Sequence, residues 1–238
     1  MIEHLVLWDI DGTLVRAGEL GAVVFEDALE AVYGERPSGR VRMSGKTDPQ
    51  IVDEYLEMMG WDAAGADQVL VELAARLAAS ESQLRREGTA LPGARELLAR
   101  LARTAGVVSS ILTGNIAPNA RVKLRAFGLD GLVDFEVGAY GSDNRDRTAL
   151  VPVALGRVAG RDGVVLHPAQ VWVVGDTPRD LACAEAAGAR CLLVATGRFG
   201  FEELEALQPD AVVRGLADTD AVFTILTADR PVAPGGPR

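Results

Sequence analysis

The segment LVLWDIDGT, residues 5–13, places Asp9 and Asp11 directly after a run of apolar residues. A near-continuous apolar run of this length is typical of a strand buried on both faces of a parallel sheet. Gly12 permits a tight turn immediately afterwards. Ligands of an open parallel sheet bind beyond the carboxyl ends of its strands, so this segment predicts a binding site at that edge.

The alternation of apolar runs and helical stretches sets the fold class. Strands are predicted at His4–Trp8, Val107–Leu112, Asp134–Val137, Val171–Gly175, Cys191–Ala195 and Ala211–Val213. Helices are predicted between them at Leu91–Ala105, Ala117–Phe127, Ala149–Val158 and Arg179–Ala187. This order is typical of an α/β protein with a parallel, Rossmann-like sheet covered by helices on both faces.

One segment breaks the alternation. Residues 18–88 contain apolar residues at helical spacing and no convincing strand, which predicts helices at Val23–Tyr33, Pro49–Met59 and Ala66–Arg86. We therefore expect an α-helical cap domain, residues 18–88, inserted into an α/β core domain of residues 1–17 and 89–228. The Pro- and Gly-rich residues 229–238 are predicted to be a disordered tail.

Composition excludes several classes of partner. The net charge is −10, and no basic face for a nucleic acid is visible. No apolar run approaches the roughly 20 residues of a membrane-spanning helix, and no signal peptide is recognised at the start of the sequence. We therefore expect a cytoplasmic protein without a membrane partner. Nothing in the sequence indicates the oligomeric state.

Polar residues end two further predicted strands. The segment ILTGN, residues 111–115, places Thr113, Gly114 and Asn115 at the start of a helix, which is a ready site for an anion. The segment VGDTPRD, residues 174–180, adds Asp176 and Asp180. Each pattern alone could simply cap a helix. These two patterns and the Asp9/Asp11 pair, all at strand ends and in this chain order, are far less frequent by chance than any one of them alone.

In this order the three strand ends resemble the motifs of the haloacid dehalogenase-like hydrolases. The residues DxDGT at 9–13 match the first motif, LTG at 112–114 the second and GDxxxD at 175–180 the fourth. The resemblance covers the whole folded chain, helical insertion included, and is strongest to the phosphoglycolate phosphatase-like branch. It implies a Mg²⁺-dependent phosphatase that acts on a small phosphorylated metabolite.

The resemblance also implies roles for the four aspartates. Asp9 would attack phosphorus and form an aspartyl-phosphate, while Asp11 would protonate the leaving group and then activate water. Mg²⁺ would be held by Asp9, the backbone carbonyl of Asp11, and Asp176, with Asp180 close behind. The dehalogenase branch lacks the second acid, because halide leaves without a proton. A phosphotransferase or phosphomutase of the same fold and a non-catalytic phosphate-binding module stay open as alternatives.

The third motif of the family, a Lys or Arg that balances phosphate charge, has three candidates. Arg147 opens the helix that follows the strand Asp134–Val137, at the expected edge of the sheet. Lys123 lies eight residues after Asn115, roughly 12 Å along a helix at 1.5 Å per residue, so we expect it to lie away from the anion site. Arg147 is therefore preferred as a phosphate-binding residue over Lys123, with Arg145 third.

The helical insertion contains the segment SGKTD, residues 44–48, which resembles the substrate-specificity loop of such caps. Gly45 would allow close approach and Lys46 would face an acidic substrate. The alternative is a helix cap formed by Thr47 and Asp48 beside a solvated lysine. A nucleotide-binding P-loop kinase is disfavoured, because five residues separate Gly39 from Gly45 where four are needed.

Overall fold

The computed structural model describes residues 2–228; the predicted tail, residues 229–238, lies outside the described residues. A six-stranded sheet has the order β5-β4-β1-β6-β7-β8, and every neighbouring pair is parallel. Its strands are β1 His4–Trp8, β4 Val107–Thr113, β5 Asp134–Tyr140, β6 Val171–Gly175, β7 Arg190–Val194 and β8 Ala211–Val213. The predicted α/β fold with a parallel sheet is confirmed, and β1 with its two aspartates lies inside the sheet.

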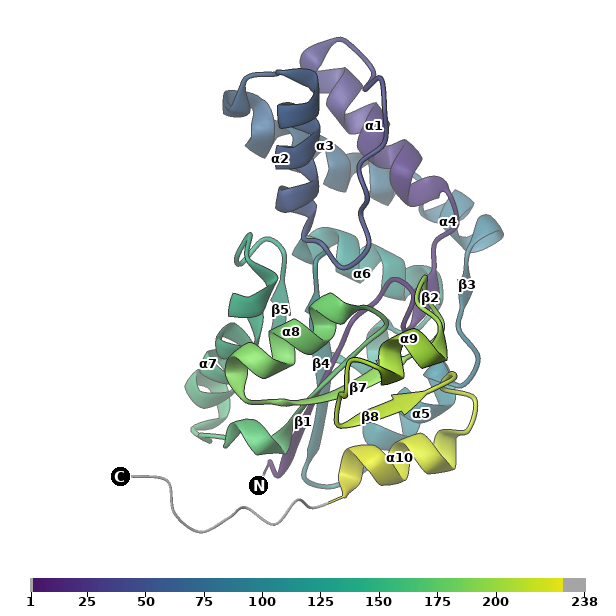
Figure 1. Ribbon diagram of the computed structural model, residues 1–238, viewed down its shortest axis with the longest axis vertical. Helices are drawn as coiled ribbons and strands as arrows, with labels where there is room; N and C mark the ends of the chain where they lie inside the picture. The colour runs from purple at the N-terminus through teal and green to yellow at the C-terminus, as the bar shows by residue number, and fades with distance from the viewer. Residues whose placement is uncertain (1, 229–238) are drawn as a thin grey trace.

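Helices cover both faces of the sheet (Figure 1). One core cluster combines the sheet with residues of α5 (Ala94–Leu101), α6 (Ala117–Ala126) and α10 (Thr219–Thr227). A second cluster, on the other face, combines it with α7 (Leu150–Asp162), α8 (Pro178–Ala187) and α9 (Phe201–Glu205). The apolar sequence of the strands follows from this arrangement, because side chains on both faces are buried.

The insertion predicted to be helical contains only helices among its regular elements (Figure 1). They are α1 Leu20–Tyr33, α2 Asp48–Met59, α3 Ala66–Ala79 and α4 Glu81–Glu87, with a 3-10 turn at Ala63–Gly65. A third apolar cluster joins these helices and includes Val122 and Ala126 of α6. The part that we predict to be a cap domain therefore has its own core and rests on a helix of the sheet-containing part.

One predicted helix of this part is wrong. Residues 66–86 form two helices, because the chain leaves helical geometry at Ser80, where φ is −91° and ψ is 7°. Serine favours helix ends, since its side chain competes for backbone hydrogen bonds. The break allows Leu84 of α4 to be buried in the cluster that contains Val122 and Ala126.

Two short strands connect the helical part to the sheet, and the sequence did not suggest them. β2, Val15–Arg16, pairs antiparallel with β3, Thr89–Ala90, so the outgoing and returning chains are hydrogen-bonded side by side. The backbone N–H of Leu91 also donates to the carbonyl of Leu14 at 2.9 Å. This ribbon sets the place where the helical part joins the sheet edge. Within residues 2–228, no helix is both long and apolar enough to cross a membrane.

Where the chain returns from the helical part to the sheet, it contains a glycine that should not tolerate a larger residue. Gly93, at the start of α5, has a φ of +83°, and an added Cβ would lie 2.0 Å from the carbonyl oxygen of Leu216. Gly93→Ala should therefore lower the free energy of unfolding by about 2 kcal/mol or more. Gly156→Ala in α7, where a Cβ meets nothing within 4 Å, should raise it by about 0.5–1 kcal/mol. Urea denaturation of both variants measures the difference, and equal effects would contradict the close packing of Gly93 against Leu216.

Candidate active site

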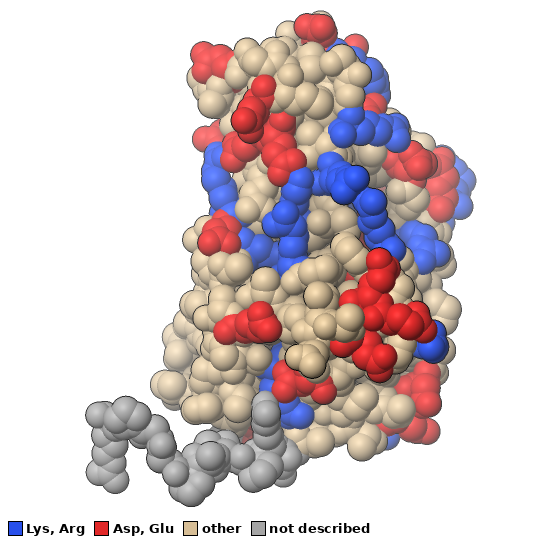
Figure 2. All heavy atoms as spheres, viewed as in Figure 1, with Lys and Arg blue, Asp and Glu red and all other residues tan. Residues whose placement is uncertain are grey.

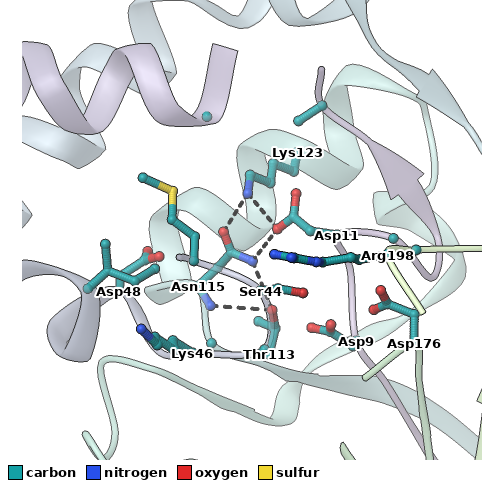
Figure 3. Close-up of a pocket in the computed structure, with 18 of the residues that line it drawn as sticks. Asp9, Asp11, Ser44, Lys46, Asp48, Thr113, Asn115, Lys123, Asp176 and Arg198 are labelled. Carbon is teal, nitrogen blue, oxygen red and sulfur yellow. Dashed lines mark hydrogen bonds and ion pairs between the residues drawn. The ribbon is translucent and has the colours of Figure 1, made fainter. Parts of the chain in front are cut away.

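A cavity of about 350 Å³ lies between the helical part and the carboxyl edge of the sheet. Three of the predicted aspartates, Asp9, Asp11 and Asp176, line it together with the Thr-Gly-Asn segment and the loop before α2 (Figure 3). The residues that carry its chemistry are Asp9, Asp11, Arg16, Lys46, Asp48, Thr113, Asn115, Lys123, Arg147, Asp176 and Arg198. Segments far apart in the sequence thus meet at one edge of the sheet, as the order of parallel strands predicts.

Three carboxylates form the floor of the site. Oxygen atoms of Asp9, Asp176 and Asp180 lie within 4.8 Å of one another, and all three residues are buried. Burial raises the pKa of Asp9 to about 6 and that of Asp176 to about 8, and the neighbouring carboxylates add to both shifts. A cluster of hard oxygen ligands with too little compensating charge is the environment that a divalent cation such as Mg²⁺ fits. The carboxylate of Asp11 is not part of this cluster.

Arg147 contacts two of these three carboxylates. Its Nη2 is 2.5 Å from Oδ1 of Asp180 and 3.2 Å from Oδ1 of Asp9, and the side chain is 4% exposed. Burial alone would lower the pKa of Arg147, but Asp180 and Asp9 raise it above its ordinary value, so the guanidinium stays charged. The other oxygen of Asp180 accepts hydrogen bonds from the N–H and hydroxyl of Thr177. Asp180 therefore holds Arg147 while Arg147 contacts Asp9.

Asp11 is held by a different set of partners. Its Oδ2 accepts hydrogen bonds from Nζ of Lys123 at 2.6 Å and from Nδ2 of Asn115 at 2.8 Å. Lys123 also donates to Oδ1 of Asn115 at 2.7 Å, so the three side chains form a closed triangle (Figure 3). Both hydrogen bonds that the described residues make to this carboxylate end on Oδ2. Oδ1 is left for a substrate or a water molecule.

The expected position of Lys123 is therefore wrong. The estimate along the helix axis placed it away from the site, but its ammonium reaches Asp11 and the cavity. Helical side chains point back toward the helix N-terminus, and a lysine is long enough to cover the remaining distance. Two cations of the site, Arg147 and Lys123, thus contact aspartates of the first motif. The third candidate, Arg145, instead forms an exposed ion pair with Asp53 of α2.

The Thr-Gly-Asn segment lies at the start of α6 as predicted. The hydroxyl oxygen of Thr113 accepts hydrogen bonds from the backbone N–H and the amide of Asn115, which leaves its own hydrogen free to donate. Asn115 thus links Thr113 to Asp11. A Cβ at Gly114 would lie 1.9 Å from the carbonyl oxygen of Lys46, so a glycine is required where the loop before α2 meets the sheet edge.

The predicted substrate-binding residues, Gly45 and Lys46, also line the cavity. The side chain of Lys46 is only 12% exposed, and its ammonium forms an ion pair with Glu54 of α2. The ammonium of Lys46 therefore has an acidic partner within the helical part. Glu54 lies eight residues later, where the first turns of α2 bring it beside Lys46. A role for Gly45 and Lys46 in substrate binding stays a prediction.

Three charged lining residues were not singled out as ligands by the sequence. Asp48 is buried at the start of α2, and Arg198 follows β7 in an exposed loop. Arg16 of β2 donates a hydrogen bond to the carbonyl of Thr196, 2.8 Å away, in that same loop. Neither arginine belongs to a recognisable motif. Asp48 had been considered only as a helix cap, a role that its position at the start of α2 equally supports.

Comparison with known proteins places these motifs in a family. The family model of the haloacid dehalogenase-like hydrolases matches residues 6–185. The tyrosine-protein kinase PtkA of Mycobacterium tuberculosis is 30% identical over 194 residues, which are 82% of this chain and 62% of PtkA. The chain thus spans less than two thirds of that relative. Phosphoglycolate phosphatase of Pseudomonas fluorescens is 30% identical over 206 residues, 82% of this chain and 71% of that protein.

Solved structures share the fold. CbbY from Rhodobacter sphaeroides, determined in complex with phosphate, superposes with a TM-score of 0.73 at 21% identity and covers 92% of this chain and 96% of its own. A predicted phosphoglycolate phosphatase from Haemophilus somnus superposes with a TM-score of 0.64 at 19% identity, covering 93% of this chain and 97% of its own. The motifs, the fold and the family model agree: the chain belongs to the haloacid dehalogenase-like hydrolases.

Proposed function

We propose that this protein is a Mg²⁺-dependent phosphatase that hydrolyses a small phosphate monoester through a phosphorylated Asp9. The observation that carries the proposal is the separation of two carboxylates within one cavity. Asp9 is buried beside Arg147 and the acidic cluster, whereas Asp11 is bound to Lys123 and Asn115. We assign the role of nucleophile to the first carboxylate and that of acid–base group to the second, a division of roles that different environments can enforce.

The acidic cluster is proposed to hold the metal ion through Asp9 and Asp176, with the backbone carbonyl of Asp11 as a further oxygen ligand. Mg²⁺ bound there would cancel the repulsion between the Asp9 carboxylate and the anionic phosphoryl group. Asp180 is proposed to act indirectly, because its oxygens already accept hydrogen bonds from Arg147 and Thr177. Its charge keeps the guanidinium of Arg147 against Asp9.

The remaining steps use side chains of the chain itself. An oxygen of Asp9 attacks phosphorus in line with the ester bond, and Asp11 gives a proton to the departing alkoxide. Asp11 then removes a proton from the water that cleaves the aspartyl-phosphate. Thr113, through its free hydroxyl hydrogen, and the Gly114 backbone N–H are proposed to hold the transferring phosphoryl oxygens, as donors positioned before the reaction.

A phosphotransferase is the second candidate, because one relative is named a tyrosine-protein kinase. In that reaction a hydroxyl of the acceptor would replace water in the second step, and Asp11 would deprotonate it. Release of one inorganic phosphate per monoester consumed supports hydrolysis. Appearance of a phosphorylated acceptor, without matching phosphate release, would support transfer.

The nucleophile can be tested by a pair of variants. Asp9→Asn should abolish turnover, because an amide is a poor nucleophile, while circular dichroism should show an unchanged fold. Asp11→Asn should retain a detectable burst of p-nitrophenol from p-nitrophenyl phosphate, since that leaving group needs little help from an acid. Phosphate release and mass spectrometry of the intact protein report the two steps. Turnover by Asp9→Asn above a few per cent of wild type would exclude Asp9 as the nucleophile.

The raised pKa values of Asp9 and Asp176 predict how stability depends on pH without metal. Both pKa values lie above the unfolded-chain value of 3.8. The folded protein therefore holds these protons more tightly, and the stabilisation that this confers at low pH is lost as the pH rises from about 4 through the folded-state pKa values of about 6 and about 8. In EDTA, the melting temperature of wild type should fall relative to that of Asp176→Asn between about pH 5 and pH 9.

Mg²⁺ should reverse this loss. The ion should raise the melting temperature of wild type more at about pH 8 than at about pH 5, and it should stabilise Asp176→Asn much less. EDTA should abolish turnover and added Mg²⁺ should restore it. Full activity in EDTA, or equal stabilisation of both proteins by Mg²⁺, would contradict the proposed metal site.

Substitution of Arg147 and substitution of Lys123 should change kcat in different ways. Arg147→Ala should lower kcat by about 100-fold or more on every substrate, the loss expected for one preorganised electrostatic contact at the reacting group. Lys123→Ala should lower kcat strongly for alkyl phosphates and only severalfold for p-nitrophenyl phosphate, because Lys123 contacts the acid–base group Asp11. Arg145→Ala, which removes an exposed ion pair, is the matched control and should change kcat little. An equal loss on both substrates for Lys123→Ala would place its ammonium on the phosphoryl group instead.

A further inference from the structure

Asp48 is a buried carboxylate in the cavity that the proposed reaction does not use. It is the first residue of α2, in the helical part, and it is 4% exposed. A buried carboxylate is costly unless hydrogen bonds or opposite charges compensate it. The groups that compensate Asp48 belong to α6, in the sheet-containing part, so the contact crosses from one part of the molecule to the other.

The hydrogen bonds of Asp48 fasten the start of α2 to the start of α6. Its Oδ2 accepts from the backbone N–H of Ile116 at 2.8 Å and from Nδ2 of Asn119 at 3.3 Å. Its own backbone N–H donates to the carbonyl oxygen of Gly114 at 2.7 Å. The N–H groups at the start of a helix have no partner within it and attract negative charge. Asp48 therefore supplies, from the helical part, the cap that α6 lacks in its own sequence.

The charge of Asp48 acts on a residue of the proposed active site. Burial raises the pKa of Asp48 to about 6, and the attraction of Lys123 is the largest effect that opposes this shift. Lys123 lies on α6 four residues after Asn119, and its ammonium donates to Asp11 and Asn115. The lysine thus lies in a field set by two carboxylates, Asp11 from the sheet edge and Asp48 from the helical part.

We propose that Asp48 is a positioning residue that couples closure of the helical part over the cavity to the placement of Lys123 on Asp11. When the helical part is docked, Asp48 caps α6 and its negative charge helps to hold the Lys123 ammonium in the cavity. When the helical part lifts away, the N–H of Ile116 loses its acceptor and Lys123 loses one of its two opposing charges. The catalytic consequence rests on the proposed function, but the docking and the placement of Lys123 do not.

The chain offers direct probes of both effects that need no activity. Lys46 and Lys123 are its two lysines, so the acylation rate of Lys123 can be followed by mass spectrometry with Lys46 as an internal reference. Hydrogen exchange at the Ile116 amide reports whether Asp48 still accepts its hydrogen bond. The matched control is Asp53→Asn, which removes the exposed ion pair between α2 and Arg145 without touching the cavity.

Asp48→Ala should accelerate exchange at Ile116 by about tenfold or more, because the amide loses its acceptor. Asp48→Asn keeps an oxygen that can accept from Ile116 but loses the charge, so it should change this exchange less. Both variants should raise the acylation rate of Lys123 severalfold relative to Lys46. Asp53→Asn should change neither measurement. Unchanged acylation of Lys123 in Asp48→Asn, or unchanged exchange at Ile116 in Asp48→Ala, would overturn the proposal.

Kinetics then test the consequence for the reaction. Asp48→Asn should lower kcat on an alkyl phosphate about tenfold, with a smaller loss on p-nitrophenyl phosphate, because Asp48 acts through Lys123 on the proton donor. Equal losses on the two substrates would mean that Asp48 only docks the helical part and would overturn the coupling. If the protein hydrolyses no monoester, the proposed function fails, while exchange and acylation still decide the role of Asp48.

Discussion

The site depends on the convergence of carboxylates at one edge of a parallel sheet. Asp9, Asp176 and Asp180 are buried within reach of one another, and Arg147 contacts the first and the last of them. Like charges buried together are costly unless cations compensate them, so the position of Arg147 and the room for a metal ion follow from the same requirement. The strand order, with β1 between β4 and β6, is what brings these side chains together.

The charge distribution of the whole molecule continues this pattern. The chain has a net charge of −10, yet Lys and Arg side chains are concentrated on the surface where the helical part meets the sheet-containing part (Figure 2). Two exposed arginines, Arg16 and Arg198, line the cavity between the same two parts. An acidic protein that binds a phosphorylated substrate gains from a local positive field, because the field attracts the substrate against the net repulsion.

The helical part completes the cavity, and its buried carboxylate is compensated by opposite charge and hydrogen bonds, as are the carboxylates at the sheet edge. The loop before α2 lies in close contact with Gly114, and Asp48 accepts a hydrogen bond from the backbone at the start of α6. The helix N-terminus and Lys123 compensate the Asp48 carboxylate, so a charge from one part of the molecule is balanced by groups of the other. The geometry of the cavity therefore depends on how the two parts dock as well as on the motifs at the strand ends.

Local sequence determined the fold and the floor of the site. Apolar runs that end in Asp9, Thr113 and Asp176 are enough to predict parallel strands with polar residues at one edge, because strand direction and side-chain burial follow from short-range patterns. The partners of Lys123, the pairing of Lys46 with Glu54 and the contact of Asp48 with α6 could not be predicted in this way. They depend on how far a long side chain extends toward the N-terminus of its helix, and on how helices that are distant in the sequence pack together. Those distances exist only in the tertiary structure, because no spacing along the chain encodes them.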